Sequence, residues 1–364
     1  SAGDEIYGTK NEDGNIDKTS AGDEIYGTKD EDGNLDKTSA GDEIYDSNGN
    51  PYIDAVFTYV NGSDPFHIEQ IRSFGKEIDP SRSRDFGQLR YAMRSVAQNA
   101  PFVRNLIVVV NKKDHSQIPS WLNASNPKIR LVELEEIFDD PDYLPSFNSN
   151  AIEWSTMNIP GLSEVYLSFC DDFSIQKPLK LPSIWHTDKH VLYEAWVAPY
   201  PHEKDAISDE YGKSLAHVHG LFNGRYKNDF TRKVGSHVPI LLNRTIMQKI
   251  RSEWKPEFDE MFRNKPFRTE KDMQFQFTYQ QYIRHHYPFV VAPEPHVHFL
   301  GAGNDEGANA KKFNDVKNDP RQFLCLQDSF EKEPSPIIHK QIHYFYEELY
   351  PHDAAWELNA IGVH

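Results

Sequence analysis

A short apolar strand that ends in two acidic residues constrains the architecture of this chain more than any other segment. Residues 165–169 are mostly apolar, with the residue alternation typical of a strand. Asp171 and Asp172 follow them. Ligands of open α/β sheets bind outside the carboxyl ends of strands. Acidic residues there can hold a hard divalent cation that also contacts phosphate oxygens. Because neighbouring side chains of a strand point to opposite faces, both carboxylates reach one ion only if the chain turns there. A solvated turn without a ligand is the alternative interpretation.

The apolar segments around this strand predict an α/β fold with a mainly parallel sheet. Runs of apolar residues typical of buried strands occur at residues 53–60, 105–110 and 129–132. Residues 87–99 place apolar side chains at helical spacing between the first two runs. Strands and helices that alternate in this way are typical of parallel sheets. Further expectations are helices over 244–253, 270–284 and 338–349, loops and short elements over 185–230 and a polar loop over 301–322.

The composition separates an acidic leader from one folded domain. Residues 1–19 and 20–38 are near copies with a period of 19, and they are too polar to bury a continuous core. We expect a disordered leader over residues 1–50, a single domain over 51–350 and a C-terminal tail over 351–364. The formal net charge is −17, and an acidic chain has no general attraction for nucleic acid. The chain contains no run of about 18 apolar residues.

The exit of the first predicted strand is a candidate ligand-binding turn. Asp54 lies in that strand, and Asn61, Gly62 and Asp64 belong to the turn that ends it. Backbone N–H groups of a glycine turn can approach a nucleotide or a pyrophosphate. These four residues are therefore candidates for binding a nucleotide donor, although a tight turn with a purely structural role explains the same pattern.

Arg90 and Arg94 are a second candidate pair for the donor. They lie four residues apart, so both face one side of the predicted helix. Two guanidinium groups at that spacing can bind phosphate, and the alternative is pairing with carboxylates of the protein itself. His237, between Ser236 and a Val-Pro pair, is a further polar candidate, although most histidines are structural.

Arg268 stands just before a predicted helix whose start also carries Glu270 and Asp272. The two acids suit the positive end of a helix dipole, which is a sufficient structural reason for them. The dipole does not explain Arg268. A guanidinium fork suits phosphate oxygens, so Arg268 is a candidate phosphate ligand.

Taken together, these stretches resemble the Stealth family, which includes the N-acetylglucosamine-1-phosphotransferase α/β subunit and bacterial capsule sugar-phosphate polymerases. The resemblance covers nearly all of residues 51–350 and follows the four conserved regions of the family in order. One departure concerns the AIEWSTMN segment, where Ser155 and Met157 stand at positions that are usually histidine in the family. The matching stretches are IDAVFTYVNGSDP (53–65), RDFGQLRYAMRSVAQNAPFVRNLIVVVN (84–111), IPSWLN (118–123), LPSFNSNAIEWSTMNIPGLSEVYLSFCDDF (144–173), RKVGSHVPILLNRTIMQKI (232–250), FRTEKDMQFQF (267–277) and RQFLCLQDSF (321–330).

The resemblance implies a catalytic domain of the nucleotide-sugar-transferase type, Rossmann-like, with inserted helical and loop segments. It implies that Glu153, Asp172, His237 and Arg268 are needed for activity, with Asp171 and Asp54 as plausible neighbours. The implied metal is Mg²⁺ or Mn²⁺ on Asp171 and Asp172. The implied reaction moves a sugar-1-phosphate, such as GlcNAc-1-phosphate, from a UDP-sugar to a hydroxyl of an acceptor glycan and releases UMP.

Two other functions compete with this interpretation. One is a conventional glycosyltransferase on the same fold, which releases UDP, and the other is an inactive glycan-binding protein. The implied partners are a nucleotide-sugar donor and a glycan or polysaccharide acceptor, whereas homo-oligomerisation is left open. Asn61, Asn123 and Asn243 lie in N-x-S/T sequons, which favours the Golgi lumen or another secretory compartment. The bacterial cytoplasm is the alternative location.

Overall fold

The fold is taken from a computed structural model that describes residues 49–80, 84–113, 116–264 and 266–358. The predicted acidic leader lies outside the described residues, apart from its last two positions. The domain boundaries expected from the sequence stay predictions.

A five-stranded sheet forms the centre of the molecule. Its strand order is β3-β2-β1-β4-β9, with parallel pairing except between β4 and the edge strand β9. Side chains of β1, β2 and β4 are buried almost throughout, as expected for a parallel sheet with both faces covered. This confirms the predicted α/β class and the mainly parallel sheet. The strands are β1 Ile53–Thr58, β2 Val103–Val110, β3 Ile129–Glu133, β4 Val165–Cys170 and β9 Ile240–Asn243.

A second sheet begins where β4 ends. Strand β5 (Phe173–Ile175) pairs antiparallel with β12 (Phe323–Asp328), and β12 pairs parallel with β11 (Val297–Ala302). Asp171 and Asp172 form the turn between β4 and β5. Helix α3 (Gln88–Asn99) fixes β5, because the Ile175 N–H donates to Ser95 Oγ at 3.0 Å and Asn99 Nδ2 donates to the Ile175 carbonyl at 2.7 Å. The acidic pair thus lies where the chain passes from one sheet to the other.

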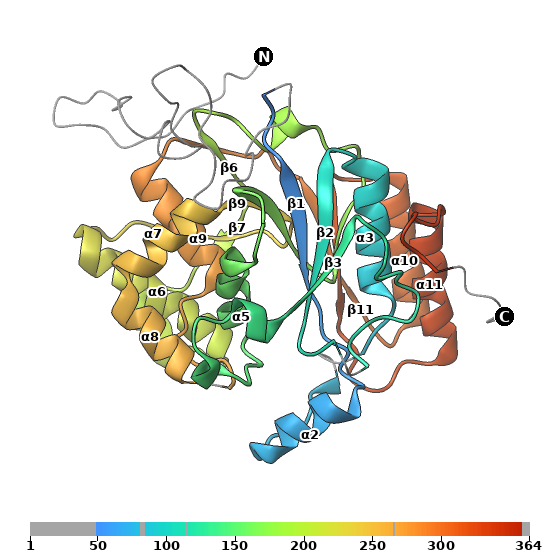
Figure 1. Ribbon diagram of the computed structural model, residues 1–364, viewed down its shortest axis with the longest axis horizontal. Helices are drawn as coiled ribbons and strands as arrows, with labels where there is room; N and C mark the ends of the chain where they lie inside the picture. Colours follow the sequence, from blue (N-terminus) through green and yellow to red (C-terminus); the bar gives the residue numbers. More distant parts are fainter. Residues whose placement is uncertain (1–48, 81–83, 114–115, 265, 359–364) are drawn as a thin grey trace.

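Helices cover the central sheet on two sides. Figure 1 shows α3, α10 and α11 gathered on one side, α5 to α9 on the other, and α2 projecting below the sheet. Two short sheets join β6 to β10 and β7 to β8. The bounds not yet given are α2 Pro65–Ser73, α4 Leu134–Ile137, α5 Ser149–Ser155, α6 Glu210–Tyr226, α7 Arg244–Glu253, α8 Lys255–Arg263, α9 Phe275–His286, α10 Glu306–Asn318, α11 Pro336–Leu349, β6 His190–Leu192, β7 Glu194–Val197, β8 Lys233–Gly235, β10 Phe289–Val291, and the 3₁₀ turns Pro141–Tyr143, Thr156–Asn158, Leu181–Ser183 and Pro201–Ala206.

Two of the predicted loops are wrong because each contains a helix. The segment 185–230 includes α6, whose Leu215, Val218 and Phe222 are buried at helical spacing and whose first turn is capped by Asp209. The segment 301–322 includes α10, in which Phe313 stacks on Phe345 of α11 at 4.3 Å. Polar composition hid both helices, since only a narrow apolar stripe of each faces the core.

The predicted helix over 270–284 begins later than expected. Helix α9 starts at Phe275 with Gln274 as its N-cap, so Glu270 and Asp272 precede the helix. The helix dipole therefore does not account for these two acids. Glu270 pairs with Lys204 at 3.0 Å on the surface, whereas Asp272 is fully buried.

Arg90 and Arg94 bind carboxylates near the C-terminal end of the described chain. Arg94 Nε donates to Glu357 Oε1 at 2.6 Å, and Arg90 Nε donates to Glu357 Oε2 at 2.5 Å. Arg94 also pairs with Asp353 and with Glu347. The side chains of Arg94 and Glu357 are 1% and 2% exposed. Structural pairing, the alternative named for these arginines, is what the structure shows, and we do not propose them as donor ligands.

Replacement of Arg94 by leucine should lower the free energy of unfolding by roughly 1–3 kcal/mol, because the buried Glu357 carboxylate then keeps only Arg90 of its two guanidinium partners. Denaturant unfolding measures this change. The control is Lys255→Met, which breaks an exposed pair with Asp259 and should cost less than about 1 kcal/mol. A stable Arg94→Leu variant with weakened nucleotide binding would contradict the structural role.

Candidate active site

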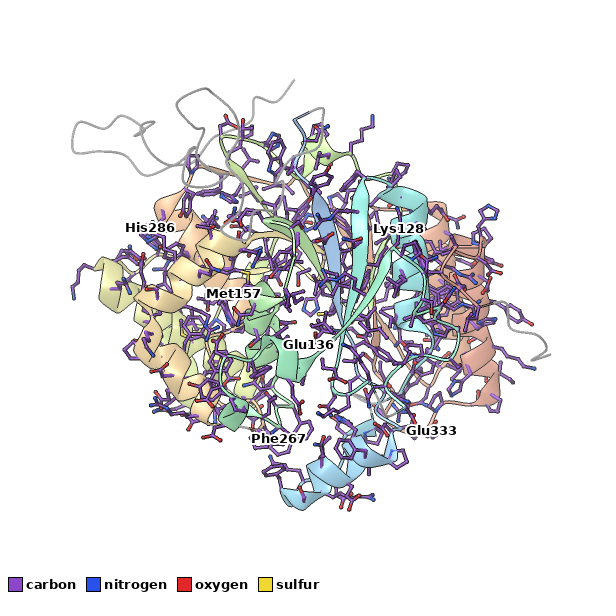
Figure 2. All side chains as sticks on the ribbon, viewed as in Figure 1. Lys128, Glu136, Met157, Phe267, His286 and Glu333 are labelled. Carbon is purple, nitrogen blue, oxygen red and sulfur yellow. The ribbon has the colours of Figure 1, made fainter. Side chains whose placement is uncertain are left out.

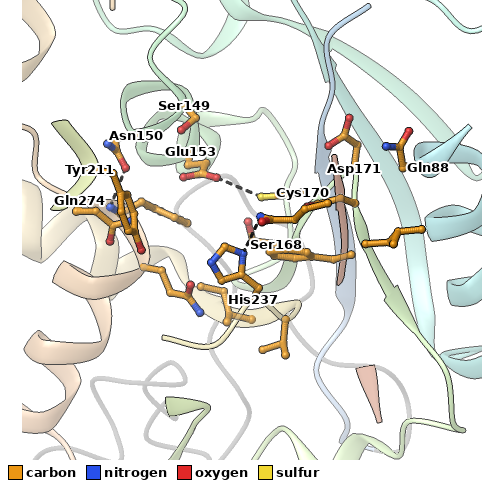
Figure 3. A pocket seen from close by; sticks show the side chains of 18 of the residues that line it. Gln88, Ser149, Asn150, Glu153, Ser168, Cys170, Asp171, Tyr211, His237 and Gln274 are labelled. Atoms are coloured by element: carbon orange, nitrogen blue, oxygen red, sulfur yellow. Dashed lines mark hydrogen bonds between the residues drawn. The ribbon is translucent and has the colours of Figure 1, made fainter. Parts of the chain in front are cut away.

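One cavity of about 580 Å³ contains the residues that the family resemblance singled out. Glu153, Asp172, His237 and Arg268 all line it, together with Asp171. They come from α5, from the turn after β4, from the loop before β9 and from the segment before α9. In Figure 3, Asp171 and Gln88 lie on one side of the cavity and Tyr211 and Gln274 on the other, with Glu153, Cys170 and His237 between them.

Glu153 projects into the cavity from α5. The thiol of Cys170 donates to its Oε1 at 3.6 Å, as the dashed line in Figure 3 marks. Burial raises the pKa of Glu153 to about 7, although the positive charge of Arg268 opposes the shift. A carboxyl group with such a pKa exchanges a proton near neutral pH, which suits a general base.

The turn after β4 brings both members of the acidic pair to the same cavity. The thiol of Cys325 donates to Asp172 Oδ2 at 3.3 Å, so β12 orients this carboxylate. Burial raises the pKa of Asp172 and, together with the charges of Asp172 and Asp85, raises the pKa of Asp171. The two carboxylates are therefore costly to ionise together without a neighbouring cation.

No group of three or more His, Cys, Asp or Glu side chains among the described residues is arranged to hold a metal ion. Asp171 and Asp172 bring two adjacent carboxylates to the cavity. Mg²⁺ is commonly held by one or two carboxylates, with water and substrate phosphate completing its coordination. The acidic pair fits that mode and does not form a complete all-protein site.

His237 and Arg268 supply the nitrogen groups of the cavity. The His237 ring lies 4.7 Å from the ring of Phe299, and its Nδ1 is 3.5 Å from Gln327 Nε2. Burial lowers the pKa of His237, so the imidazole is neutral at pH 7. Arg268 donates to Ser149 Oγ at the first position of α5. A neutral imidazole and a guanidinium near carboxylates can together contact an anionic ligand.

Asp54, expected as a donor ligand, is absent from the cavity lining. It is the second residue of β1, at the amino end of a parallel strand, whereas the cavity adjoins the carboxyl end of β4. Arg104 forms two hydrogen bonds to its carboxylate, at 2.9 and 2.7 Å, and the Ser163 N–H donates to Oδ2 at 2.9 Å. Asp54 therefore joins β1, β2 and the segment before β4.

The turn after β1 also lies outside the cavity lining. Asp64 caps α2 through the Phe66 N–H and accepts from Gln117 Nε2 at 2.9 Å. Asn61 donates to the Ser116 carbonyl at 2.5 Å, and Gly62 is buried between Asn61 and Asp64. These contacts agree with the structural alternative given for this turn, and we do not propose its residues as donor ligands.

Several lining residues were not predicted from the sequence. Gln327 and Asp328 end strand β12, inside the RQFLCLQDSF stretch. They could have been found by the reasoning applied to Asp171 and Asp172, since they too follow an apolar strand. No sequence signal marked the other residues that line the cavity, among them Arg84, Gln88, Ser149, Tyr211 and Gln274.

The two positions at which the sequence departs from the family lie in the core. Ser155 is buried and donates to the Ala151 carbonyl, and Met157, labelled in Figure 2, is buried in the 3₁₀ turn that follows α5. Neither lines the cavity. Asn243, one of the three sequon residues, is buried and caps α7, so it is not accessible to a glycan in the folded chain.

The parallel sheet and the acidic cavity at the carboxyl end of β4 define an α/β protein with a ligand site of the kind that open α/β sheets carry. Residues 82–192 match Stealth protein conserved region 2, and residues 236–285 match conserved region 3. These two matches confirm the resemblance to the Stealth family seen in the sequence. Both matched regions contribute candidate residues to the cavity.

Curated relatives are polysaccharide phosphotransferases of bacteria. The chain is 27% identical over 84% of its length to an exopolysaccharide phosphotransferase of Nocardia farcinica and to the capsular polysaccharide phosphotransferase SacB of Neisseria meningitidis serogroup A. These matches span 61% and 57% of the two relatives, so the chain covers less than two thirds of either. The exopolysaccharide phosphotransferase cps2G of Lactiplantibacillus plantarum is 27% identical, with 76% of this chain and 87% of that protein covered.

Solved structures give a weaker similarity. The galactosyltransferase LgtC in complex with donor and acceptor sugar analogues is 13% identical with a TM-score of 0.39, over 82% of this chain and 95% of that one. Mouse xyloside xylosyltransferase 1 is 10% identical with a TM-score of 0.37, over 75% and 97%. No helix among the described residues is long and apolar enough to cross a membrane. The expected Golgi location finds no support in these relatives, since the phosphotransferases named above are bacterial.

Proposed function

We propose that this chain transfers a sugar-1-phosphate from a nucleotide sugar to a hydroxyl group of an acceptor glycan and releases a nucleoside monophosphate. The observation that carries the proposal is the convergence of Glu153, Asp171, Asp172, His237 and Arg268 on one cavity. These residues come from four separate segments of the chain. The names of the bacterial relatives, which are polysaccharide phosphotransferases, support the same reaction class.

The proposed chemistry is an attack of the acceptor oxygen on the phosphorus that carries the sugar. A new P–O bond forms to the acceptor, the bond to the bridging oxygen of the pyrophosphate breaks, and UMP leaves when the donor is a UDP-sugar. The hydroxyl proton passes to a base on the protein. Such a transfer depends mainly on positioning and on neutralising charge at the phosphate oxygens.

The cavity offers a group for each of these tasks. Glu153, with its pKa near 7, is the proposed base that accepts the proton of the acceptor. Arg268 contacts phosphate oxygens, for which its fork geometry is suited. His237 is neutral and donates a hydrogen bond to a phosphate oxygen. Arg268 is the single strongly basic side chain among the five residues named above. This division of roles places it at the phosphates, which are the most anionic part of the donor.

Asp171 and Asp172 are the proposed holders of Mg²⁺ or Mn²⁺. These two carboxylates would hold the cation, which would supply neutralisation of the charge on the pyrophosphate. The raised pKa values of both carboxyls favour a cationic partner, because a cation removes the repulsion between them.

The identity of the released nucleotide tests the proposal. We expect incubation with a panel of UDP-sugars, an acceptor glycan and Mg²⁺ or Mn²⁺ to give UMP, which chromatography separates from UDP. The product should carry a phosphodiester that phosphorus NMR detects. Release of UDP would instead indicate a conventional glycosyltransferase. Binding of glycan with no nucleotide release from any donor would indicate an inactive glycan-binding protein.

Replacement of Asp172 by asparagine tests the metal site. The change removes one charge at nearly constant shape, so we expect a loss of at least about 10²-fold in kcat and weaker binding of Mn²⁺, measured by electron paramagnetic resonance. The melting temperature should change little, since asparagine can still accept from Cys325. Full activity of the wild-type chain in excess EDTA would contradict a metal role for the pair.

The proposed base predicts a particular pH dependence. Glu153 is protonated well below its pKa of about 7, so the fraction in the basic form grows as pH rises. We expect kcat/KM to fall about tenfold per pH unit from pH 6 downwards and to level off above pH 8. In Glu153→Gln the rate should be low and this acid limb should disappear. An unchanged acid limb in the variant would assign the proton to another group.

A further inference from the structure

A buried carboxylate outside the cavity links the two segments that carry Arg268 and Glu153. Asp272 is 0% exposed and does not line the cavity. Its Oδ2 accepts from Asn148 Nδ2 at 2.7 Å and from Asn150 Nδ2 at 3.2 Å. Its Oδ1 accepts from the Thr269 hydroxyl at 2.9 Å. The carboxylate thus joins the start of α5 to the turn that follows Arg268.

Additional hydrogen bonds cross the same contact. The Phe275 N–H donates to Asn150 Oδ1 at 3.1 Å, and Trp154 Nε1 donates to the Met273 carbonyl at 2.8 Å. Arg268 itself donates to Ser149 Oγ. Figure 3 shows Ser149, Asn150 and Glu153 side by side at the edge of the cavity. Residues 148–154 and 268–275 therefore form one hydrogen-bonded unit, which we call the α5 lock, and Asp272 is its fully buried carboxylate.

The cost of burying this carboxylate indicates a role other than stability. The side chains that donate hydrogen bonds to the Asp272 carboxylate among the described residues are two amides and the Thr269 hydroxyl, and none of them is a cation. Burial raises the pKa of Asp272, as expected for a carboxylate that water no longer solvates. Well-packed apolar residues commonly stabilise a protein at least as well as such buried charged groups. What a carboxylate adds is direction, because each of its oxygens fixes the position of its donors.

We propose that Asp272 is a positioning residue, which sets the place of the Arg268 guanidinium relative to the Glu153 carboxylate through the α5 lock. This inference rests on the proposed function, in which Arg268 contacts the donor phosphates and Glu153 accepts the acceptor proton. Misplacement of a reacting group by about 1 Å can cost on the order of 10²-fold in rate. Asp272 is thus expected to influence turnover without contact with either substrate.

Replacement of Asp272 by asparagine should lower kcat by on the order of 10²-fold with a smaller change in KM, measured as nucleotide release. The matched control is Asp305→Asn, a cap of α10 through the Ala308 N–H, where asparagine serves equally well. That variant should keep wild-type kcat. Equal turnover of Asp272→Asn and the wild type would overturn the proposal.

A double-mutant cycle with Arg268→Lys separates positioning from general destabilisation. If Asp272 acts through Arg268, Asp272→Asn should cost no more than a few-fold in kcat when Arg268 is already lysine, because interacting residues are not additive. Fully additive losses would show that Asp272 acts independently of Arg268 and would overturn the proposal.

An exchange of charges keeps the test valid if Asp272→Asn folds poorly. In Asp272→Asn with Asn148→Asp, the carboxylate and the amide change places, and the aspartate at 148 remains a good helix cap. We expect the double variant to recover most of the lost kcat and melting temperature. Recovery of the melting temperature without any recovery of kcat would show a merely structural role.

Hydrogen exchange provides a readout that does not depend on the reaction. In Asp272→Asn the amides of residues 148–154 and 268–275 should lose protection, whereas β1 and β2 should keep theirs. If the chain releases no UMP but the lock loosens as expected, the proposed function fails and the lock itself stands. If UMP is released and the hydrogen-exchange protection of the lock is unchanged in Asp272→Asn, the positioning role of Asp272 is contradicted and the proposed function stands.

Discussion

The repulsion between two neighbouring carboxylates, placed where one sheet passes into another, is the constraint on which the site depends. Asp171 and Asp172 are held from both sides, because β4 lies in the central sheet and β5 is hydrogen-bonded to β12 and to Ser95 and Asn99 of α3. The turn cannot relax outwards without breaking one of these pairings. The chain therefore keeps two acids close together in a partly buried cavity, where their ionisation is costly until a cation approaches.

The cations of the cavity do not remove this excess of negative charge. Arg84 lines the cavity but is bound by Asp328 at 2.6 Å and by Glu333 at 3.0 Å. Arg268 donates to a neutral hydroxyl, so its charge is available to an anionic ligand. In the proposed function, Arg268 serves the phosphates and the two carboxylates serve a metal ion, a combination that suits a donor pyrophosphate accompanied by a divalent cation better than it suits either one alone. Binding of donor and metal should consequently be coupled.

The sequence was sufficient to predict the place of residues whose environment is local. It was insufficient for residues whose partners are distant in the chain. An apolar strand followed by two acids identified Asp171 and Asp172, and the family motifs identified Glu153, His237 and Arg268. Asp54 was grouped with the turn after the first predicted strand, but it lies at the amino end of β1, where Arg104 binds its carboxylate. Arg94 resembled a phosphate ligand because its partner Glu357 lies 263 positions away. Local spacing does not indicate which carboxylate a helix will meet after folding.

The same limitation explains why Asp272 could be assigned to a helix dipole from its sequence alone. Its partners Asn148 and Asn150 precede it by more than a hundred residues, and they lie in a stretch that also carries Ser149 and Glu153 of the cavity lining. Apolar packing tolerates shifts of a side chain with little loss of energy, whereas a hydrogen bond weakens steeply with misalignment. A site built from distant segments therefore needs hydrogen bonds wherever two functional groups must keep a fixed separation. The α5 lock supplies such hydrogen bonds between the segments that carry Arg268 and Glu153. The proposed positioning role thus explains why a buried polar unit adjoins the cavity where apolar residues would otherwise suffice.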